Sequence, residues 1–288
     1  MELEIEAWVA EAPANQRKFR MAVHVILKAI ATSDHLQPHM IMKGGMLLGI
    51  RYKSSRYTKD IDFSTPELFE DFNQDQFRIE LDQSLAVAAD ELSYGIDCIV
   101  QSFKIQPKER PGIKLTHPSL LIKIGYAEKG SRLHQKLLQQ KCSDIIKIDY
   151  SFNEVVPHPE ELSLEGEQLT AYGFTDLIAE KIRSVMQQVV RNRQRRQDIY
   201  DLNYLLDSTG VLNGEEKLIV LKSIIIKSEG RLPEGFVNQN TLDDQKIHDL
   251  SKADYQLMAD EVEGELPDFE ESYSKVNDFY KSLPWNYL

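Results

Sequence analysis

Asp60 and Asp62 are two carboxylates in the short segment Asp60-Ile-Asp-Phe63. The segment alternates polar and apolar residues, which predicts a half-buried strand. Side chains at positions i and i+2 leave a strand on the same face, so the two carboxylates lie together while Ile61 and Phe63 face the core. Adjacent like charges favour a cation between them, and Mg²⁺ or Mn²⁺ suits oxygen ligands. The pair predicts a metal site, although most such pairs taken alone are only exposed strand residues.

A third carboxylate, Asp149, lies in the segment Ile145-Ile-Lys-Ile-Asp-Tyr150. The apolar residues of this segment share one predicted strand face, which leaves Lys147 and Asp149 on the other. Three carboxylates on neighbouring strands can hold two metal ions, which activate an attacking oxygen and stabilise a leaving pyrophosphate. The predicted catalytic and metal-binding residues are therefore Asp60, Asp62 and Asp149.

The residues before the acidic pair are of types that bind phosphate. Gly44 and Gly45 follow a short apolar strand and open a helical turn, where backbone N–H groups can point at a phosphate that no Cβ obstructs. Lys43 precedes them, and Arg56 and Thr58 add a cation and a hydroxyl. A plain tight turn explains the glycines equally well on their own. A glycine turn, a basic loop and an acidic strand, in this order, are the parts that a nucleoside-triphosphate site needs.

The stretch 43–63, KGGMLLGIRYKSSRYTKDIDF, resembles the signature of the polymerase-β-like nucleotidyltransferase superfamily. More closely, it resembles the AbiEii/AbiGii-type toxins of type IV toxin–antitoxin systems, whose pattern is Gly-Gly-[Ser/Thr]-Ala-Leu and then Arg-x-[Ser/Thr]-x-Asp-Leu-Asp-Phe. The residues that fit are Gly44, Gly45, Leu48, Arg56, Thr58, Asp60, Asp62 and Phe63. Met46 stands where the family has the Ser or Thr that helps to hold the triphosphate. Phosphate contact then falls to backbone amides, Lys43 or basic side chains elsewhere.

A second resemblance covers TDLIAEKIRS at 175–184 and RNRQRRQDIYDL at 191–202. These segments are similar to the Glu-Lys-[Leu/Ile]-Arg-Ala helix and the Arg-Arg-x-Asp-x-Tyr-Asp-Leu block of the same branch. The resemblance implies that Lys181 meets the triphosphate. From the residues alone, Lys181 is equally an ordinary solvated lysine paired with an acid.

Arg191, Arg193, Arg195 and Arg196 form the densest positive cluster of the chain. Such a run is either a solvated face or an anchor for the phosphates of an NTP or of a nucleic-acid acceptor. We predict Arg196 as a nucleotide contact. We expect Asp198 to orient one of these cations and not to bind metal itself.

The predicted architecture is α+β. Helices are expected at 15–32, 46–50 and 75–92, and strands at 39–43, 60–63, 96–105, 120–126 and 145–150. Helices follow at 175–190, with Thr175 as cap, and at 196–206, 212–226 and 268–283, while 229–249 reads as a loop. The resemblance implies a polymerase-β-like mixed sheet flanked by helices in residues 1–165, and a helical lobe in 166–288. Such a layout suits a substrate cleft between two lobes.

The composition bounds the class of protein. The 288 residues carry a net charge of −12, which does not suit a general polyanion binder but permits a local basic patch. The sequence has no run of about 18 apolar residues, so it predicts no membrane span. The N-terminus lacks the layout of a signal peptide. Cys98 and Cys142 are expected to be buried thiols of a cytoplasmic protein.

These patterns predict an enzyme that transfers a nucleotide from an NTP to an acceptor with release of pyrophosphate. The resemblance implies a growth-inhibiting toxin of an abortive-infection or toxin–antitoxin system, neutralised by a cognate antitoxin encoded nearby, and an RNA or tRNA end is the expected acceptor. Three alternatives stay open: a nucleotidyltransferase for small molecules or proteins, a metal-dependent nuclease, and a non-catalytic nucleotide-binding protein.

Overall fold

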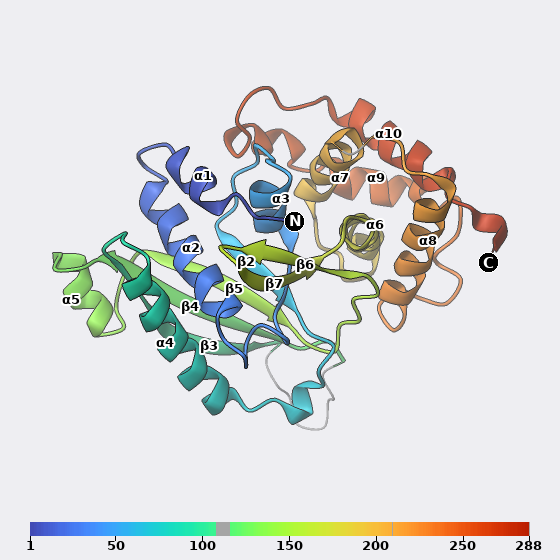
Figure 1. Ribbon diagram of the computed structural model, residues 1–288. Coiled ribbons are helices and arrows are strands. Elements are labelled where there is room, and N and C mark those ends of the chain that lie inside the picture. The colour runs from blue at the N-terminus through green and yellow to red at the C-terminus, as the bar shows by residue number, and fades with distance from the viewer. Residues whose placement is uncertain (108–115, 209, 288) are drawn as a thin grey trace. The chain divides into compact units, whose positions relative to one another are not determined.

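The structure, a computed structural model, describes residues 1–107, 116–208 and 210–287. The chain forms two compact units (Figure 1). The sheet unit contains Met1–Arg51 and Lys59–Ala171, and the helical unit contains Tyr52–Thr58 and Tyr172–Leu288. The short segment Tyr52–Thr58 therefore belongs to the helical unit, although it precedes the strand that carries Asp60 and Asp62.

Within the described residues, seven strands form one mixed sheet in the order β3-β4-β5-β2-β1-β7-β6. The strands are β1 (Ile41–Lys43), β2 (Asp60–Ser64), β3 (Ile96–Gln106), β4 (Ser119–Glu128), β5 (Ile145–Ser151), β6 (Pro159–Leu164) and β7 (Glu167–Tyr172). β2 lies at the centre, parallel to β5 and antiparallel to β1. The predicted mixed sheet and the α+β class are confirmed.

The sheet has one apolar face and one polar face. The helices of this unit are α1 (Ile5–Ala10), α2 (Arg17–Ala31), α3 (Gly44–Arg51), α4 (Gln74–Glu91) and α5 (Arg132–Leu138). α2 and α4 lie side by side across the apolar face (Figure 1). Ile61, Phe63 and Ile148 are fully buried there, and Phe77 of α4 stacks on Tyr150 with ring centroids 5.6 Å apart. Because strand side chains alternate, the polar residues of β2 and β5 emerge on the opposite face.

The helical unit is built around α6 (Phe174–Arg191). Its neighbours are α7 (Arg196–Ser208), α8 (Gly214–Ser228) and α9 (Gln245–Lys252), and α10 (Phe269–Lys281) packs on α7 (Figure 1). Apolar residues of α6 such as Ile182 are buried, as predicted, but so are Lys181, Ser184 and Gln188. A helix with neighbours on several sides buries its polar stripe as well as its apolar one. Lys181 is therefore not an ordinary solvated lysine.

Residues 52–58 are hydrogen-bonded to the helical unit. The backbone N–H of Tyr57 donates to the carbonyl of Glu261 at 2.7 Å, and the N–H of Glu263 donates to the carbonyl of Ser55 at 3.1 Å. The Ser55 and Tyr200 hydroxyls are 3.1 Å apart. Arg56, although close to Asp60 in sequence, thus belongs to the helical unit.

The longer elements confirm the sequence prediction, and the corrections concern short ones. The prediction of a loop at 229–249 is wrong for its last residues, because α9 begins at Gln245. The Asp244 side chain caps this helix by accepting from the N–H of Lys246. Thr175 does not cap α6, which begins at Phe174 after Gly173. Short α1, α5, β6 and β7 were not predicted, because short elements carry little periodicity.

Cys98 and Cys142 are free and buried, as predicted, and burial raises the pKa of the Cys98 thiol. Among the described residues, no helix combines the length and the apolar character needed to cross a membrane.

Candidate active site

Asp62 and Asp149 are the centre of the polar sheet face. They are direct partners in the parallel pairing of β2 with β5, so their side chains leave adjacent strands on the same face. Asp60, two residues earlier, is the partner of Lys147, whose Nζ lies 3.9 Å from Oδ1 of Asp60. Among the described residues, no group of three or more His, Cys, Asp or Glu side chains is gathered so that it could hold a metal ion. The geometry thus places two carboxylates side by side and the third next to a lysine.

Gly44 determines where the Asp62 carboxylate can lie. Gly44 begins α3 with φ of +76°, and a Cβ built on it would be 2.1 Å from Oδ2 of Asp62. Any side chain would therefore require both a strained backbone and displacement of the carboxylate. Asp62 consequently lies against the N-terminus of α3, where the helix dipole favours a negative charge. The glycine predicted from phosphate chemistry makes room for the Asp62 carboxylate.

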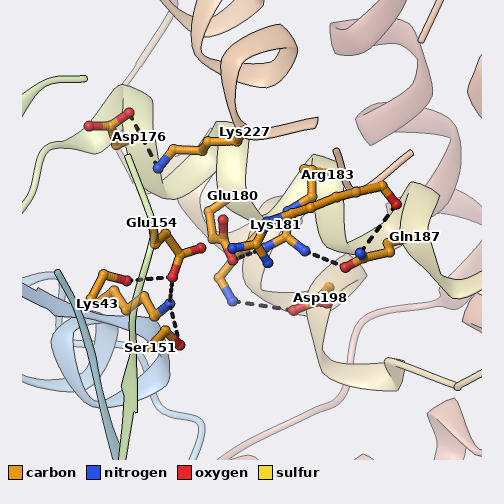
Figure 2. Close-up of polar contacts among 12 residues, drawn as sticks. Lys43, Ser151, Glu154, Asp176, Glu180, Lys181, Arg183, Gln187, Asp198 and Lys227 are labelled. Carbon is orange, nitrogen blue, oxygen red and sulfur yellow. Dashed lines mark hydrogen bonds and ion pairs between the residues drawn. The ribbon is translucent and has the colours of Figure 1, made fainter. Parts of the chain in front are cut away.

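Lys43 lies on the same face as the carboxylates, opposite Asp62 in the antiparallel pairing of β1 with β2. Figure 2 shows its ammonium group against Glu154 and Ser151, with Nζ 3.3 Å from the Ser151 hydroxyl. The Ser64 hydroxyl also donates to Glu154, at 2.7 Å. Glu154 is almost completely buried. Lys43 is thus held by an internal acid that joins β1, β2 and the end of β5.

The remaining predicted residues of this segment differ in exposure. Gly45 and Met46 are buried, and Met46 is 1% exposed, so the position that carries Ser or Thr in the family is here part of the core. Thr58 is partly exposed at the end of the segment that belongs to the helical unit.

In the helical unit, Asp201 joins two of the predicted cations. Arg56 donates to both of its carboxylate oxygens, Nε to Oδ1 at 2.7 Å and Nη2 to Oδ2 at 2.9 Å. Lys181 donates to Oδ2 of Asp201 and lies 3.5 Å from Oδ1 of Asp198. The Asp201 side chain is completely buried, and that of Lys181 is 8% exposed. A bidentate guanidinium–carboxylate pair of this kind has a well-defined geometry.

The charges of this network stabilise one another. Burial by itself raises the pKa of Asp201, but the guanidinium of Arg56 and the ammonium of Lys181 outweigh it and hold the pKa below its ordinary value. Burial acts to lower the pKa of Arg56, and the Asp201 carboxylate outweighs that effect and raises it. Asp201 and Arg56 are therefore both charged at neutral pH.

The arginine cluster divides into paired and exposed members. Arg195 donates to Asp198 at 2.9 Å, and Arg196 pairs with Glu261. Asp198 thus contacts Lys181 and Arg195, as expected for an acid that orients cations (Figure 2 shows its contact with Lys181). Arg191 is exposed at the end of α6. The pKa of Arg191 is nevertheless lowered, first by partial burial of its guanidinium and then by the positive charges of neighbouring arginines. These are Arg183, Arg231, Arg195 and Arg193.

Sequence reasoning did not single out Asp201 or Glu154 as site residues. The signal for Asp201 was its position three residues after Asp198, on the same side of one helix. Glu154 follows β5 in an irregular segment with no pattern of its own, so only the three-dimensional structure identifies it as the partner of Lys43.

A mixed sheet that carries adjacent carboxylates on its central strands, next to a helix opened by glycine, is the arrangement that the sequence predicted for a nucleotidyltransferase. The chain matches the family described as "Nucleotidyl transferase AbiEii toxin, Type IV TA system" over residues 25–279, and it belongs to that family.

A solved structure has the same fold. The crystal structure of a presumed nucleotidyltransferase from H. pylori aligns with a TM-score of 0.50 at 15% sequence identity, and the alignment covers 94% of this chain and 96% of that one. No curated protein sequence gives a significant match.

Proposed function

We propose that this nucleotidyltransferase transfers a nucleoside monophosphate from an NTP to the hydroxyl at an RNA end, tRNA included, in a reaction that requires a divalent metal ion. The observation that carries the proposal is the direct pairing of Asp62 with Asp149 on the polar face of the sheet. Two carboxylates on directly paired residues repel each other and suit a hard cation with oxygen ligands.

Asp62 and Asp149 would hold Mg²⁺ or Mn²⁺, and Asp60 would complete the site by moving from Lys147. The bound ion would supply neutralisation of the developing phosphate charge and a lower pKa for the attacking hydroxyl. Gly44 keeps space for the Asp62 carboxylate. Asp60, Asp62 and Asp149 act by position, because phosphoryl transfer is accelerated mainly by alignment and charge neutralisation.

The acceptor oxygen forms a bond to the α-phosphorus of the NTP, and the bond between that phosphorus and the pyrophosphate oxygen breaks. Phosphate contacts are assigned to the backbone N–H groups of Gly44 and Gly45 and to Thr58. Lys181 and Arg196 of the helical unit are assigned to the triphosphate on the basis of the family motif. All four of these cations are bound by acids of the protein, Lys43 by Glu154, Arg56 and Lys181 by Asp201, and Arg196 by Glu261. In this proposal Lys43 and Arg56 keep a supporting role, and Lys181 and Arg196 would exchange their acids for phosphate.

Membership of this family supports a role as the toxin of a type IV toxin–antitoxin system. We infer that the protein acts in the cytoplasm, inhibits growth by modifying RNA and is neutralised by a cognate antitoxin encoded nearby. Expression of the chain with and without its neighbouring genes, scored by colony formation, tests this role.

The enzymatic test uses the full-length protein, each α-³²P-labelled NTP, Mg²⁺ and total RNA. We expect label on RNA with at least one NTP, and its loss in Asp62→Asn and Asp149→Asn. Asp90→Asn is the matched control, because this acid lies in the same unit on α4 with a side chain 77% exposed. Removal of metal by EDTA should stop label transfer, and MgCl₂ or MnCl₂ should restore it.

Other outcomes assign other functions. Shortened RNA without incorporated label would identify a nuclease, and label on protein or on small molecules would change the acceptor. Bound NTP without any turnover, measured by calorimetry, would identify a non-catalytic nucleotide-binding protein.

A further inference from the structure

The strand register arranges the polar sheet face as parallel rows of side chains. One row runs across four strands, from Ser102 to Lys123, Lys147 and Asp60. The next row contains, from β3 to β1, Lys104, Leu121, Asp149, Asp62 and Lys43. Since direct cross-strand partners share a face, these side chains form one continuous surface. The two carboxylates of the active site lie in the same surface as a group of lysines.

Three of these lysines, two from the first row and one from the next, form what we call the lysine row: Lys123 on β4, Lys147 on β5 and Lys104 on β3. Lys104 is exposed, Lys123 is partly exposed, and the Lys147 side chain is 47% exposed. Within the described part of the chain, the ion pair of Lys147 with Asp60 at 3.9 Å is the single one that the row makes.

The lysine row is electrostatically unfavourable for the protein alone. Lys123 and Lys147 are direct cross-strand partners, and like charges in such positions repel each other. The described residues 100–107 and 116–150 contain seven Lys or Arg and three Asp or Glu, although the whole chain carries a net charge of −12. The basic charge is therefore concentrated in the part of the sequence that forms β3, β4 and β5.

Helix α5 adds to this basic surface. A Cβ at Gly125, which follows Lys123 by two residues on β4 and shares its face, would meet Leu137 of α5 at 2.8 Å. α5 therefore packs on the polar face beside the lysine row. Its Arg132 and Lys136 are exposed. The helix extends the row with two further cations.

We propose that the lysine row binds the phosphodiester backbone of the acceptor RNA and leads its 3′ end to Asp62 and Asp149. This inference rests on the proposed function and names the surface that the acceptor uses. Lys104 lies three strands from Asp62, a span of about 14 Å at roughly 4.8 Å per strand. That span is longer than a triphosphate whose α-phosphorus lies at the carboxylates, so it fits a polynucleotide. Ammonium groups contact phosphates without reading bases, which makes the surface tolerant of sequence.

The test is binding of a fluorescent 20-nucleotide single-stranded RNA to the full-length protein, measured by anisotropy at several NaCl concentrations. Each phosphate contact contributes about −0.7 to the slope of log K against log[NaCl] for a single strand. We expect the triple variant Lys104→Gln, Lys123→Gln, Lys147→Gln to reduce the magnitude of this slope by about 2 and to weaken binding at low salt on the order of 10-fold. Lys104→Gln alone, at the position furthest across the sheet from Asp62, should reduce it by about 0.7.

The matched control removes three positive charges elsewhere: Lys18→Gln, Lys275→Gln and Lys281→Gln, each from an existing surface ion pair. An equal loss of binding in the control and in the row variant, or no loss in either, would overturn the inference. Melting temperatures within a few degrees of the wild type establish that each variant is folded.

A kinetic measurement separates this inference from the proposed function. Where label transfer to RNA occurs, the row variant should raise the KM for RNA and leave the KM for NTP unchanged. Label transfer with an unchanged KM for RNA would remove the acceptor role of the row while the proposed function stands. No label transfer to any acceptor, with RNA binding still weakened in the row variant, would remove the proposed function and leave the row as an RNA-binding surface.

Discussion

In the sheet unit, Asp62 and Asp149 lie side by side as like charges, and Lys147 lies 3.9 Å from their neighbour Asp60. In the helical unit, Asp201 is completely buried between Arg56 and Lys181, which supply the opposite charges. The first arrangement places two negative charges on adjacent strands of a polar sheet face, which suits a metal ion. The second satisfies its charges within the protein. Acidic residues of the first kind are expected to serve activity, and those of the second kind to serve stability.

The largest effect is expected for Asp201→Asn. This change leaves two buried cations without their shared carboxylate, and breaking a buried ion pair in this way costs about 3–5 kcal/mol. Urea unfolding measures the free energy. Asp207→Asn is the control on the same helix, because the Asp207 side chain is 66% exposed in its pair with Lys275, and such surface pairs contribute about 0–1 kcal/mol. Equal losses in the two variants would contradict the difference between the two regions.

Gly44→Ala should give the next largest effect, and on activity. The new Cβ would displace the Asp62 carboxylate, so we expect label transfer to fall on the order of 10²-fold. Gly49→Ala is the control within α3, because a Cβ there meets no atom within 4 Å and alanine favours a helix. Full activity in Gly44→Ala would show that the position of Asp62 is not limiting.

The pH dependence of stability should also distinguish the two regions. The pKa of Asp201 is lowered in the folded protein, so its contribution to stability is present above the ordinary Asp value of about 3.9 and is lost as the pH falls through the lowered folded pKa. Melting temperatures between pH 6 and pH 2.5 should fall more steeply for the wild type than for Asp201→Asn. Parallel curves would place the acid sensitivity elsewhere.

The smallest effect is expected for the stability of Asp149→Asn. The change removes one of two adjacent like charges from a polar sheet face, so the free energy of unfolding should change by less than about 0.5 kcal/mol or rise slightly. Urea unfolding measures it alongside the activity assay. A loss of several kcal/mol would mean that Asp149 supports the fold in the way that Asp201 does.

The periods of strands and helices were sufficient to predict the longer secondary-structure elements and their apolar faces. Alternation in 60–63 and 145–150 correctly predicted the exposed and buried faces of β2 and β5, because a strand has a fixed two-residue period. The apolar stripe of α6 was predicted in the same way. The polar side of α6 was not, because a helical pattern does not reveal how many neighbours a helix has. α9 was missed because eight residues carry little periodicity.

The sequence by itself determined the family motifs, the α+β class and which residues share a strand face, since these depend on residue type and local spacing. Only the tertiary structure decided which strands are neighbours, and thus that Asp62 pairs with Asp149 and Lys123 with Lys147. It also decided that Arg56 belongs to the helical unit and that Asp201 neutralises it. Pairings between residues far apart in the chain depend on the packing of whole elements, and no local pattern encodes them.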